Sequence, residues 1–445
     1  MSVGTSSGAA LGWAAVLSTT LAWGQAPAQM GDTTEAPPRS QSVTPATRVT
    51  LHDAVARALA KNPTYATALL EVRRADAVVR ETKAAWLPTL YSYDSVTHLD
   101  GKRVEGGSVI LAQNELAANL TLTVPLVMTR QWLTTEESRM GADATKATSA
   151  DVRRLVAYST GQAYLAVYAQ KLVIEVDELA RDTAESHAAY AHQRYAGGVG
   201  TSIDEVRAIQ EAATDDALVQ QAYALLVLDE EALGILVGSE GPLDAADEPT
   251  LAEPPSLQRG LDEAGRRPDV VALDLRSAAS RKTVEDDWSD YAPYLVGVAA
   301  PFYQNPATPT LPLSGYALEL LLTVPLYDGG LRDGQHRERA ALRDEASVAY
   351  EAGLRQARSD VRAAFEAMRR ADGALRSSRD AARFANRALD LANAAYRGGA
   401  ITNIEVIDAE RQARDAETQA AIAADKSRQA RLTMLTATDR FPERQ

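Results

Sequence analysis

Three of the carboxylates in two short segments of the chain could do chemistry, and these segments are near copies of each other. The segments read YAGGVGTSIDEVRA, from Tyr195, and YRGGAITNIEVIDA, from Tyr396, and six of their fourteen positions are identical. Asp204 lies in the first segment, and Glu405 and Asp408 lie in the second. Carboxylates early in a helix interact favourably with the positive end of its dipole, which would explain all three. The functional alternative is a ring of carboxylates at a pore mouth, which requires several copies of the chain.

Two pairs of glycines predict how these segments fold. Glycine adopts the left-handed conformation that ends a helix without strain, so we expect a helix to end at each pair. A threonine three residues before an acidic residue has the spacing of a capping box, which opens the next helix. Each segment is therefore predicted to be a tight helix-turn-helix. The residues of the two turns are Tyr195, Gly197, Gly198, Thr201, Tyr396, Gly398, Gly399 and Thr402.

The spacing of the same residue types argues against enzyme chemistry. A phosphate-binding loop would follow a strand and carry Gly-Lys-Ser/Thr, whereas these glycines follow predicted helices. The histidines form no HExxH or His-x-His pattern, so we expect solvated surface groups and no metal site. We expect no catalytic residue and no cofactor. The histidines are His52, His98, His187, His192 and His336.

The overall charge and composition narrow the class of protein further. The net charge is -14, with no block of Lys and Arg, so nucleic acid is not expected as a partner. Cysteine is absent, which excludes disulfides, thiolate metal sites and a lipidated N-terminal cysteine. Only four Phe are present, and Ala is frequent, which favours long helices in thin, elongated packing over a large round core.

The start of the chain resembles an export signal. Leu11–Trp23 is an apolar run of signal-peptide length, and small residues follow it, although no Lys or Arg precedes Arg39. We predict a signal peptide over residues 1–28 and a disordered linker over 29–48; a disordered tail throughout is the alternative. No later run reaches the roughly 18 apolar residues of a membrane helix.

The two turns belong to a duplication that covers most of the chain. LHDAVARALAKNP, from Leu51, matches LQRGLDEAGRRP, from Leu257, and ANLTLTVPL, ending at Leu126, matches LELLLTVPL, ending at Leu326. The sequence therefore predicts two similar structural repeats. The predicted parts are a first repeat at 49–237, an inter-repeat linker at 238–255, a second repeat at 256–438 and a short tail at 439–445.

Each repeat is predicted to contain a helix, two strands and a long helical hairpin. The first helices are expected at about Leu51–Ala85 and Leu257–Asp287. The long helix of the first repeat should run from about Leu133 to Arg194, on the order of 90 Å. A heptad seam is expected along this helix, at Tyr158, Leu165, Leu172 and Leu179.

The predicted strands have one apolar face. Leu116–Val124 and Tyr316–Val324 alternate between apolar and more polar residues, and their partners are expected at Leu90–Leu99 and Tyr294–Tyr303. This length and pattern suit a membrane β-strand, and a small soluble sheet is the alternative. Prolines before the first strand and at the end of the second are predicted swivel points, since proline is excluded from strand and helix interiors. These prolines are Pro88, Pro125, Pro293 and Pro325.

Four strands per chain have a consequence for assembly. Four strands cannot close a barrel, and an open strand edge cannot face lipid. If the strands span a bilayer, chains must share one barrel. Two chains would supply eight strands and a filled interior, whereas three would supply twelve and leave room for a lumen.

These features together resemble the TolC-type outer membrane efflux proteins (outer membrane factors). The resemblance covers roughly Val49–Thr438 and includes the exported start, the duplication, the paired strands ending in TVPL and the Tyr-x-Gly-Gly-x-x-Thr turns. It implies a mainly α fold with a small β part: long antiparallel helical hairpins forming a coiled-coil α-barrel, and four transmembrane strands completed to a 12-stranded barrel in a homotrimer.

The resemblance also implies function and partners. Such a protein is a passive exit duct for efflux or type I secretion in the outer membrane of a Gram-negative bacterium, with a long periplasmic extension. Its helical turns dock onto a periplasmic adaptor (membrane fusion) protein beside an inner-membrane pump of RND or ABC type. The alternative is a soluble periplasmic coiled-coil scaffold without a membrane barrel.

Finally, the resemblance implies a gate at the turns. By position, its acidic members are Asp204, Glu405 and Asp408, and its tyrosine is Tyr396. Ile401 stands where the family has a latch arginine. Closure is therefore expected to depend on packing and on other hydrogen bonds.

Overall fold

The computed structural model describes residues 46–442. The predicted signal peptide and most of the linker predicted over 29–48 lie outside the described residues, as do the last three residues of the tail. The end of that linker is structured, because Thr47–Val49 form strand β1, which pairs in parallel with β6 (Leu243–Ala245). None of the described helices has a segment long and apolar enough to cross a membrane.

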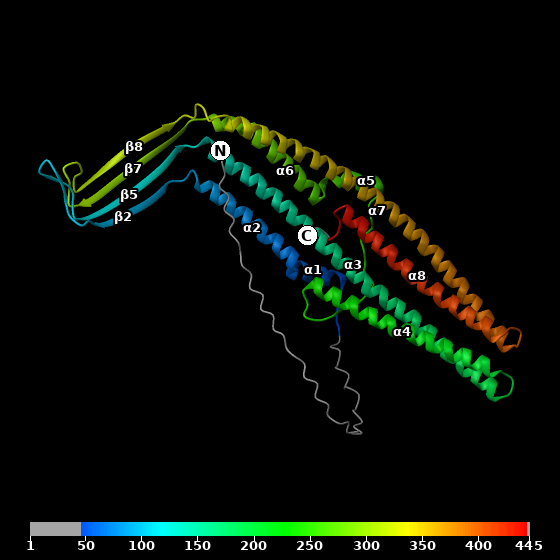
Figure 1. Cartoon of the computed structure of the whole chain (residues 1–445). Helices are drawn as coiled ribbons and strands as arrows, with labels where there is room; N and C mark the ends of the chain where they lie inside the picture. The colour runs from blue at the N-terminus through cyan, green and yellow to red at the C-terminus, as the bar shows by residue number, and fades with distance from the viewer. Residues whose placement is uncertain (1–45, 443–445) are drawn as a thin grey trace, which may run out of the picture. The chain divides into compact units, whose positions relative to one another are not determined.

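The duplication is visible in the order of the elements (Figure 1). The first repeat contains α1 (Leu51–Lys61), α2 (Pro63–Ala84), β2 (Thr89–His98), β3 (Arg103–Glu105), β4 (Ser108–Leu111), β5 (Asn114–Val127), α3 (Thr129–Ala196) and α4 (Ser202–Val237). The second contains α5 (Leu257–Glu263), the short 3₁₀ helix η1 (Ala264–Arg266), α6 (Pro268–Glu285), η2 (Asp286–Tyr291), β7 (Tyr294–Asn305), β8 (Ser314–Thr323), α7 (Leu331–Arg397) and α8 (Asn403–Ala437).

The first helix of each repeat is broken, so the prediction of one continuous helix was wrong in both. Asn62 ends α1 in an extended conformation and accepts a hydrogen bond from Thr64 N at 2.9 Å, with Pro63 in the first turn of α2. Arg267 is extended in the same way before Pro268. The cause is shared: proline disfavours a helical conformation in the residue before it and has no N–H to donate.

The two repeats share one antiparallel sheet in the order β2-β5-β7-β8. Three of the predicted swivel prolines stand outside the strands: Pro88 and Pro293 directly precede β2 and β7, and Pro325 follows β8. Pro125 does not, because it lies within β5, paired with Val296 beside a bulge. A proline is tolerated inside a strand at a bulge, where the ladder is already interrupted.

One face of this sheet is largely apolar on β5, β7 and β8, and β2 adds Leu90 to it but also Ser92 and Asp94. The register places Leu90, Leu122, Ala299 and Leu318 side by side in one row. The adjacent rows contain Val124, Gly297 and Leu320, and then Val127, Leu295 and Leu322. Leu318 and Leu320 are about 70% exposed, at 72% and 68%. The outer strands β2 and β8 each have one partner strand among the described residues.

The helical hairpins are held by two small cores. The first combines β1, α1 and β6 with α3 and α4, and its centre includes Tyr164 and Leu233. The second packs α6 against α7 and α8, around Val270, Val361 and Met434. Gly161 lets α3 and α8 approach each other closely, since a Cβ there would lie 2.9 Å from Leu432.

The buried stripe of α3 differs from the predicted heptad seam near the turn. Leu165 is buried, but Leu179 is 69% exposed. The buried positions in this part of α3 are instead Ile174, Asp177, Ala184, His187 and Ala191, of which Asp177, Ala184 and Ala191 are seven residues apart. Leu172 and Leu179 line a groove between the two hairpins.

Candidate functional site

The two predicted helix-turn-helix segments are present and share one backbone design. In the first turn, Gly198 has φ +73° and its N–H donates to the carbonyl of Tyr195, while Val199 N donates to Arg194 O at 3.0 Å. The second turn repeats this with Gly399 at φ +74°. This pair of bonds is the Schellman motif, in which glycine takes the left-handed position after the helix. Gly197 and Gly398 adopt ordinary helical angles instead.

Threonine and an acidic residue open the next helix in both repeats. The Thr201 hydroxyl accepts from Asp204 N and donates to the Asp204 carboxylate at 2.6 Å. In the second turn, the Glu405 carboxylate accepts from Thr402 N at 2.9 Å. Asp204 is half-buried, whereas Glu405 and Asp408 are exposed. The capping role accounts for Asp204 and Glu405 within one chain; a ring at a pore mouth remains a prediction.

Tyr396, the predicted gate tyrosine, is enclosed by α3. It is 6% exposed, and its ring centroid lies 5.5 Å from that of His187 and 5.8 Å from that of Tyr190. The Arg194 guanidinium lies over the ring, 4.7 Å from its centroid. Burial raises the pKa of Tyr396, although Arg194 opposes this effect. An arginine therefore contacts the tyrosine from the first turn, while Ile401 is half-buried in the second.

His187 was predicted to be solvated, and this was wrong. It is 8% exposed between the hairpins, with Nδ1 2.8 Å from Glu410 Oε1 and Nε2 2.7 Å from Asn403 Oδ1. The Asn403 amide nitrogen in turn donates to the Asp204 carbonyl at 3.1 Å. The sequence offered one signal. His187 and Arg194 are seven residues apart and therefore share one face of the helix, and this is the face that packs on Tyr396.

Buried ion pairs join α4 and α8 about one helical turn farther along. Arg411 donates to Glu211 at 2.8 Å, and Arg414 contacts both Glu211 and Asp215. Glu211 and Asp215 are 2% and 4% exposed. Burial raises the pKa of Asp215, and Arg414 offsets this only in part. Because removing one partner would leave a buried charge uncompensated, these pairs fix the first hairpin against the second.

One hollow lies at the buried ion pairs, and a second lies at two of the predicted swivel prolines. The groove between the hairpins measures about 590 Å³ and includes Glu410, Arg414 and Asp215 in its wall. Pro88 and Pro125 line a second hollow at the base of the sheet, together with Trp86 and Trp132. The structure thus brings the two prolines of the first repeat together.

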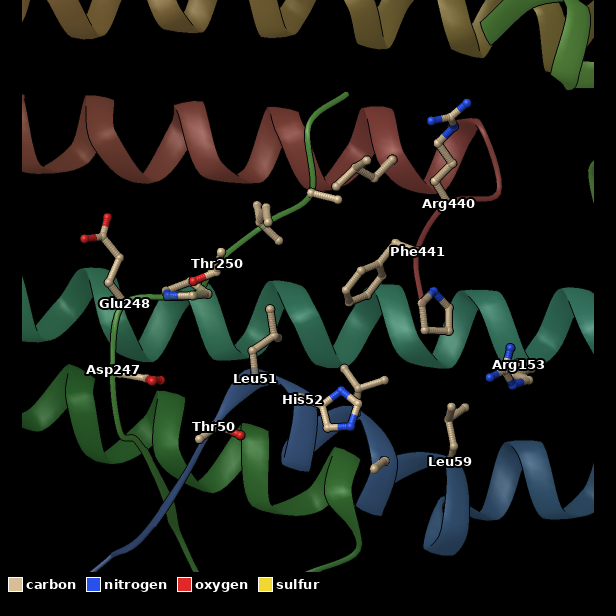
Figure 2. A pocket seen from close by; sticks show the side chains of 17 residues that line it. Thr50, Leu51, His52, Leu59, Arg153, Asp247, Glu248, Thr250, Arg440 and Phe441 are labelled. Carbon is tan, nitrogen blue, oxygen red and sulfur yellow. The ribbon is translucent and has the colours of Figure 1, made fainter. Parts of the chain in front are cut away.

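A third hollow is remote from the turns. Figure 2 shows that it lies between α1 and the segment that contains Asp247 and Thr250, with Phe441 on its far side. Its volume is about 380 Å³, and it adjoins the first core. Neither here nor elsewhere in the described residues do three potential metal ligands of the His, Cys, Asp or Glu type cluster together.

Comparisons with known proteins agree on the type of fold. Residues 262–439 match the sequence model of the family described as "Outer membrane efflux protein". A stretch of 233 residues, 49% of this chain, is 27% identical to the outer membrane protein OprJ of Pseudomonas aeruginosa. That match spans 47% of OprJ, about half of its length.

Solved structures extend the similarity to nearly the whole chain. The structure of CusC has a TM-score of 0.77 at 17% identity and covers 90% of this chain and 95% of its own. The open state of the MtrE outer membrane channel of Neisseria gonorrhoeae has a TM-score of 0.74 at 20% identity, covering 87% and 88%. The fold of the chain is therefore that of these solved structures, and the sequence of residues 262–439 matches the outer membrane efflux protein family.

Proposed function

We propose that three copies of this chain form an outer-membrane channel, the passive exit duct of a tripartite efflux or type I secretion system. The observation that carries the proposal is the largely apolar face that β5, β7 and β8 form in a four-stranded sheet with β2. A shared 12-stranded barrel would place this face against lipid and pair the outer edges of β2 and β8 with neighbouring chains. A soluble scaffold would leave both the face and the edges in water, where such features promote aggregation.

The assembly is tested by the mass of the protein extracted from outer membranes in detergent, corrected for bound detergent. Three chains per particle, together with ion conductance in planar bilayers, are expected. A monomer in the soluble fraction would remove the barrel and favour the scaffold.

The helical turns are the proposed docking site for a periplasmic adaptor protein, which links the duct to an inner-membrane pump of RND or ABC type. Val199, Ile203 and Val206 support this role, since they are 74%, 54% and 62% exposed around the first turn. Apolar residues grouped on a surface are typical of protein interfaces. The four swivel prolines are proposed to set the angle between the strands and the helices.

The gate of the duct is proposed to lie at the same turns. Glu405 and Asp408 are exposed, and three copies would place six such carboxylates around the opening. Asp408→Ala and Glu405→Ala should then weaken block of the channel by divalent cations. Single-channel recordings with and without Mg²⁺ measure this, and an unchanged block in both variants would contradict the assignment.

A further inference from the structure

The contact between His187 and the second hairpin has an unusual hydrogen-bond pattern. Both ring nitrogens face oxygen atoms of α8: Nδ1 faces Glu410 Oε1 at 2.8 Å, and Nε2 faces Asn403 Oδ1 at 2.7 Å. The orientation of the Asn403 amide is fixed, because its nitrogen donates to the Asp204 carbonyl. Nε2 must therefore carry a proton. With a carboxylate at Nδ1, this geometry suits an imidazolium that donates on both sides.

The groups around the ring leave Glu410 as its charged partner. Tyr396 of α7 lies beside the His187 ring, and Tyr190 of α3 lies on the Tyr396 ring. From α4, the carbonyl of Asp204 accepts a hydrogen bond from the Asn403 amide. The nearby charges of α4 and α8 are paired with each other, as Glu211 and Asp215 with Arg411 and Arg414.

The charge of the Glu410 carboxylate is compensated by His187. Its carboxylate is buried, and its Oε2 has no hydrogen-bond partner within residues 46–442. Burial of the imidazole opposes its charge, but the hydrogen bonds to Glu410 and Asn403 outweigh burial and raise the pKa of His187 above 6.5. Glu410 also lines the groove between the hairpins, which gives protons a route to the pair.

We propose that His187, Glu410 and Asn403 form a proton-dependent latch that holds the two hairpins of each chain together while His187 carries both ring protons. When the ring loses one, Glu410 is left as a buried carboxylate without a cation, and the turns separate. The inference rests on the proposed function, because separation of the turns would open the duct.

The direction of the pH effect follows from linkage. The latched state binds the proton more tightly than the separated state, where His187 has its ordinary pKa of about 6.5. The latch is therefore complete below about pH 6.5 and is lost as the pH rises through the raised pKa of His187.

His192 provides a matched control on the same helix. Its Nδ1 lies 2.6 Å from Glu205 Oε1, so it is also paired with a glutamate. His192 is exposed in this pair, which joins α3 to α4 within the first hairpin, not between the hairpins. Replacing His192 should leave the contact between the hairpins unchanged.

The test compares the full-length protein with His187→Gln, Glu410→Gln and His192→Gln in planar bilayers at pH 6 and pH 9. The open fraction of the parent should rise from pH 6 to pH 9, because the ring loses its second proton in this interval. Glutamine does not titrate, so His187→Gln should show a flat profile, whereas His192→Gln should behave like the parent. Glu410→Gln removes the carboxylate that deprotonation would leave uncompensated, so the rise of the open fraction with pH should be lost. A flat parent profile, or an unchanged profile in His187→Gln, would overturn the latch.

A second measurement separates this inference from the proposed function. Because the chain has no cysteine, spin labels can be placed on the exposed turns through Val199→Cys and Ala400→Cys. The distances between labels should lengthen from pH 6 to pH 9 in the parent and stay constant in His187→Gln. Lengthening without any conductance would retain the latch and reject the channel. Conductance with distances that do not depend on pH would retain the channel and reject the latch.

Discussion

The two turns have similar sequences and the same backbone conformation, but corresponding residues are exposed in the first turn and buried in the second. Tyr195 is 46% exposed, whereas Tyr396, its counterpart 201 residues later, is 6% exposed. Val206 and Ile407 form a second such pair, at 62% and 2%. The first hairpin covers the second turn, while no described residue covers the corresponding face of the first.

This difference indicates which surface of the chain is free to contact another copy. If the contact inside the chain is repeated approximately between chains, the bare face around Tyr195 would receive the second hairpin of the next copy. The long helix α7 has a suitable surface, with Phe384 and Leu391 exposed at 67% and 57% near its end. The residues that close one interface within the chain would thus reappear, in altered form, between chains.

The largest expected effect breaks the buried ion pairs that fix one hairpin against the other. Arg414→Met leaves Asp215 and part of Glu211 uncompensated, which should cost about 3–5 kcal/mol of unfolding free energy. Denaturant unfolding followed by circular dichroism measures this. The control is Arg369→Met, whose ion pair with Glu366 has both side chains more than half exposed, so its loss should cost less than about 1 kcal/mol. Similar losses in both variants would contradict the role of burial.

A smaller effect tests the comparison directly at the two tyrosines. Tyr396→Ala removes a buried ring and should cost about 3 kcal/mol. Tyr195→Ala removes an exposed ring and should cost about 0.5 kcal/mol or less in a dissociated chain. Denaturant unfolding of the two variants measures both costs. If Tyr195→Ala is also costly in the assembled protein, the bare face is occupied there by another copy.

The smallest effect concerns the feature that both turns share. Gly399→Ala forces a Cβ into a left-handed position and should cost about 1–2 kcal/mol, as should Gly198→Ala. Gly398→Ala is the control, because that residue has helical angles and room for a methyl group. Thermal unfolding of the three variants should give equal shifts for the first two. Unequal shifts would mean that the surroundings affect the turns themselves.

Much of the fold could be predicted because its signals are local and repeated. The glycine pairs predicted both turns, and the alternation in β5 and β8 predicted the strands. The breaks before Pro63 and Pro268 were missed although proline is a local signal. The place of Pro125 was missed for a different reason: the bulge depends on its pairing with β7, which no single strand reveals.

The contacts between the hairpins were missed because the residues that make them differ in type from their counterparts in the other repeat. His187, Glu410 and Arg414 correspond by position to Ala388, Ile209 and Ala213 in the other repeat. A search for similarity between the halves passes over such residues. Polar residues at positions that are apolar in the sister repeat were the available signal, since a buried polar group needs a partner.

The length of the second hairpin has a mechanical consequence. From the core at Val361 to the turn at Gly398, α7 is a rigid lever about 55 Å long. A tilt of about 5° at that fulcrum would move the turn by about 5 Å, with little change in packing at the core. The leverage also works in reverse: a modest force applied at the turn exerts a large torque on the whole arm. A single buried ion pair near the far end is therefore well placed to hold it.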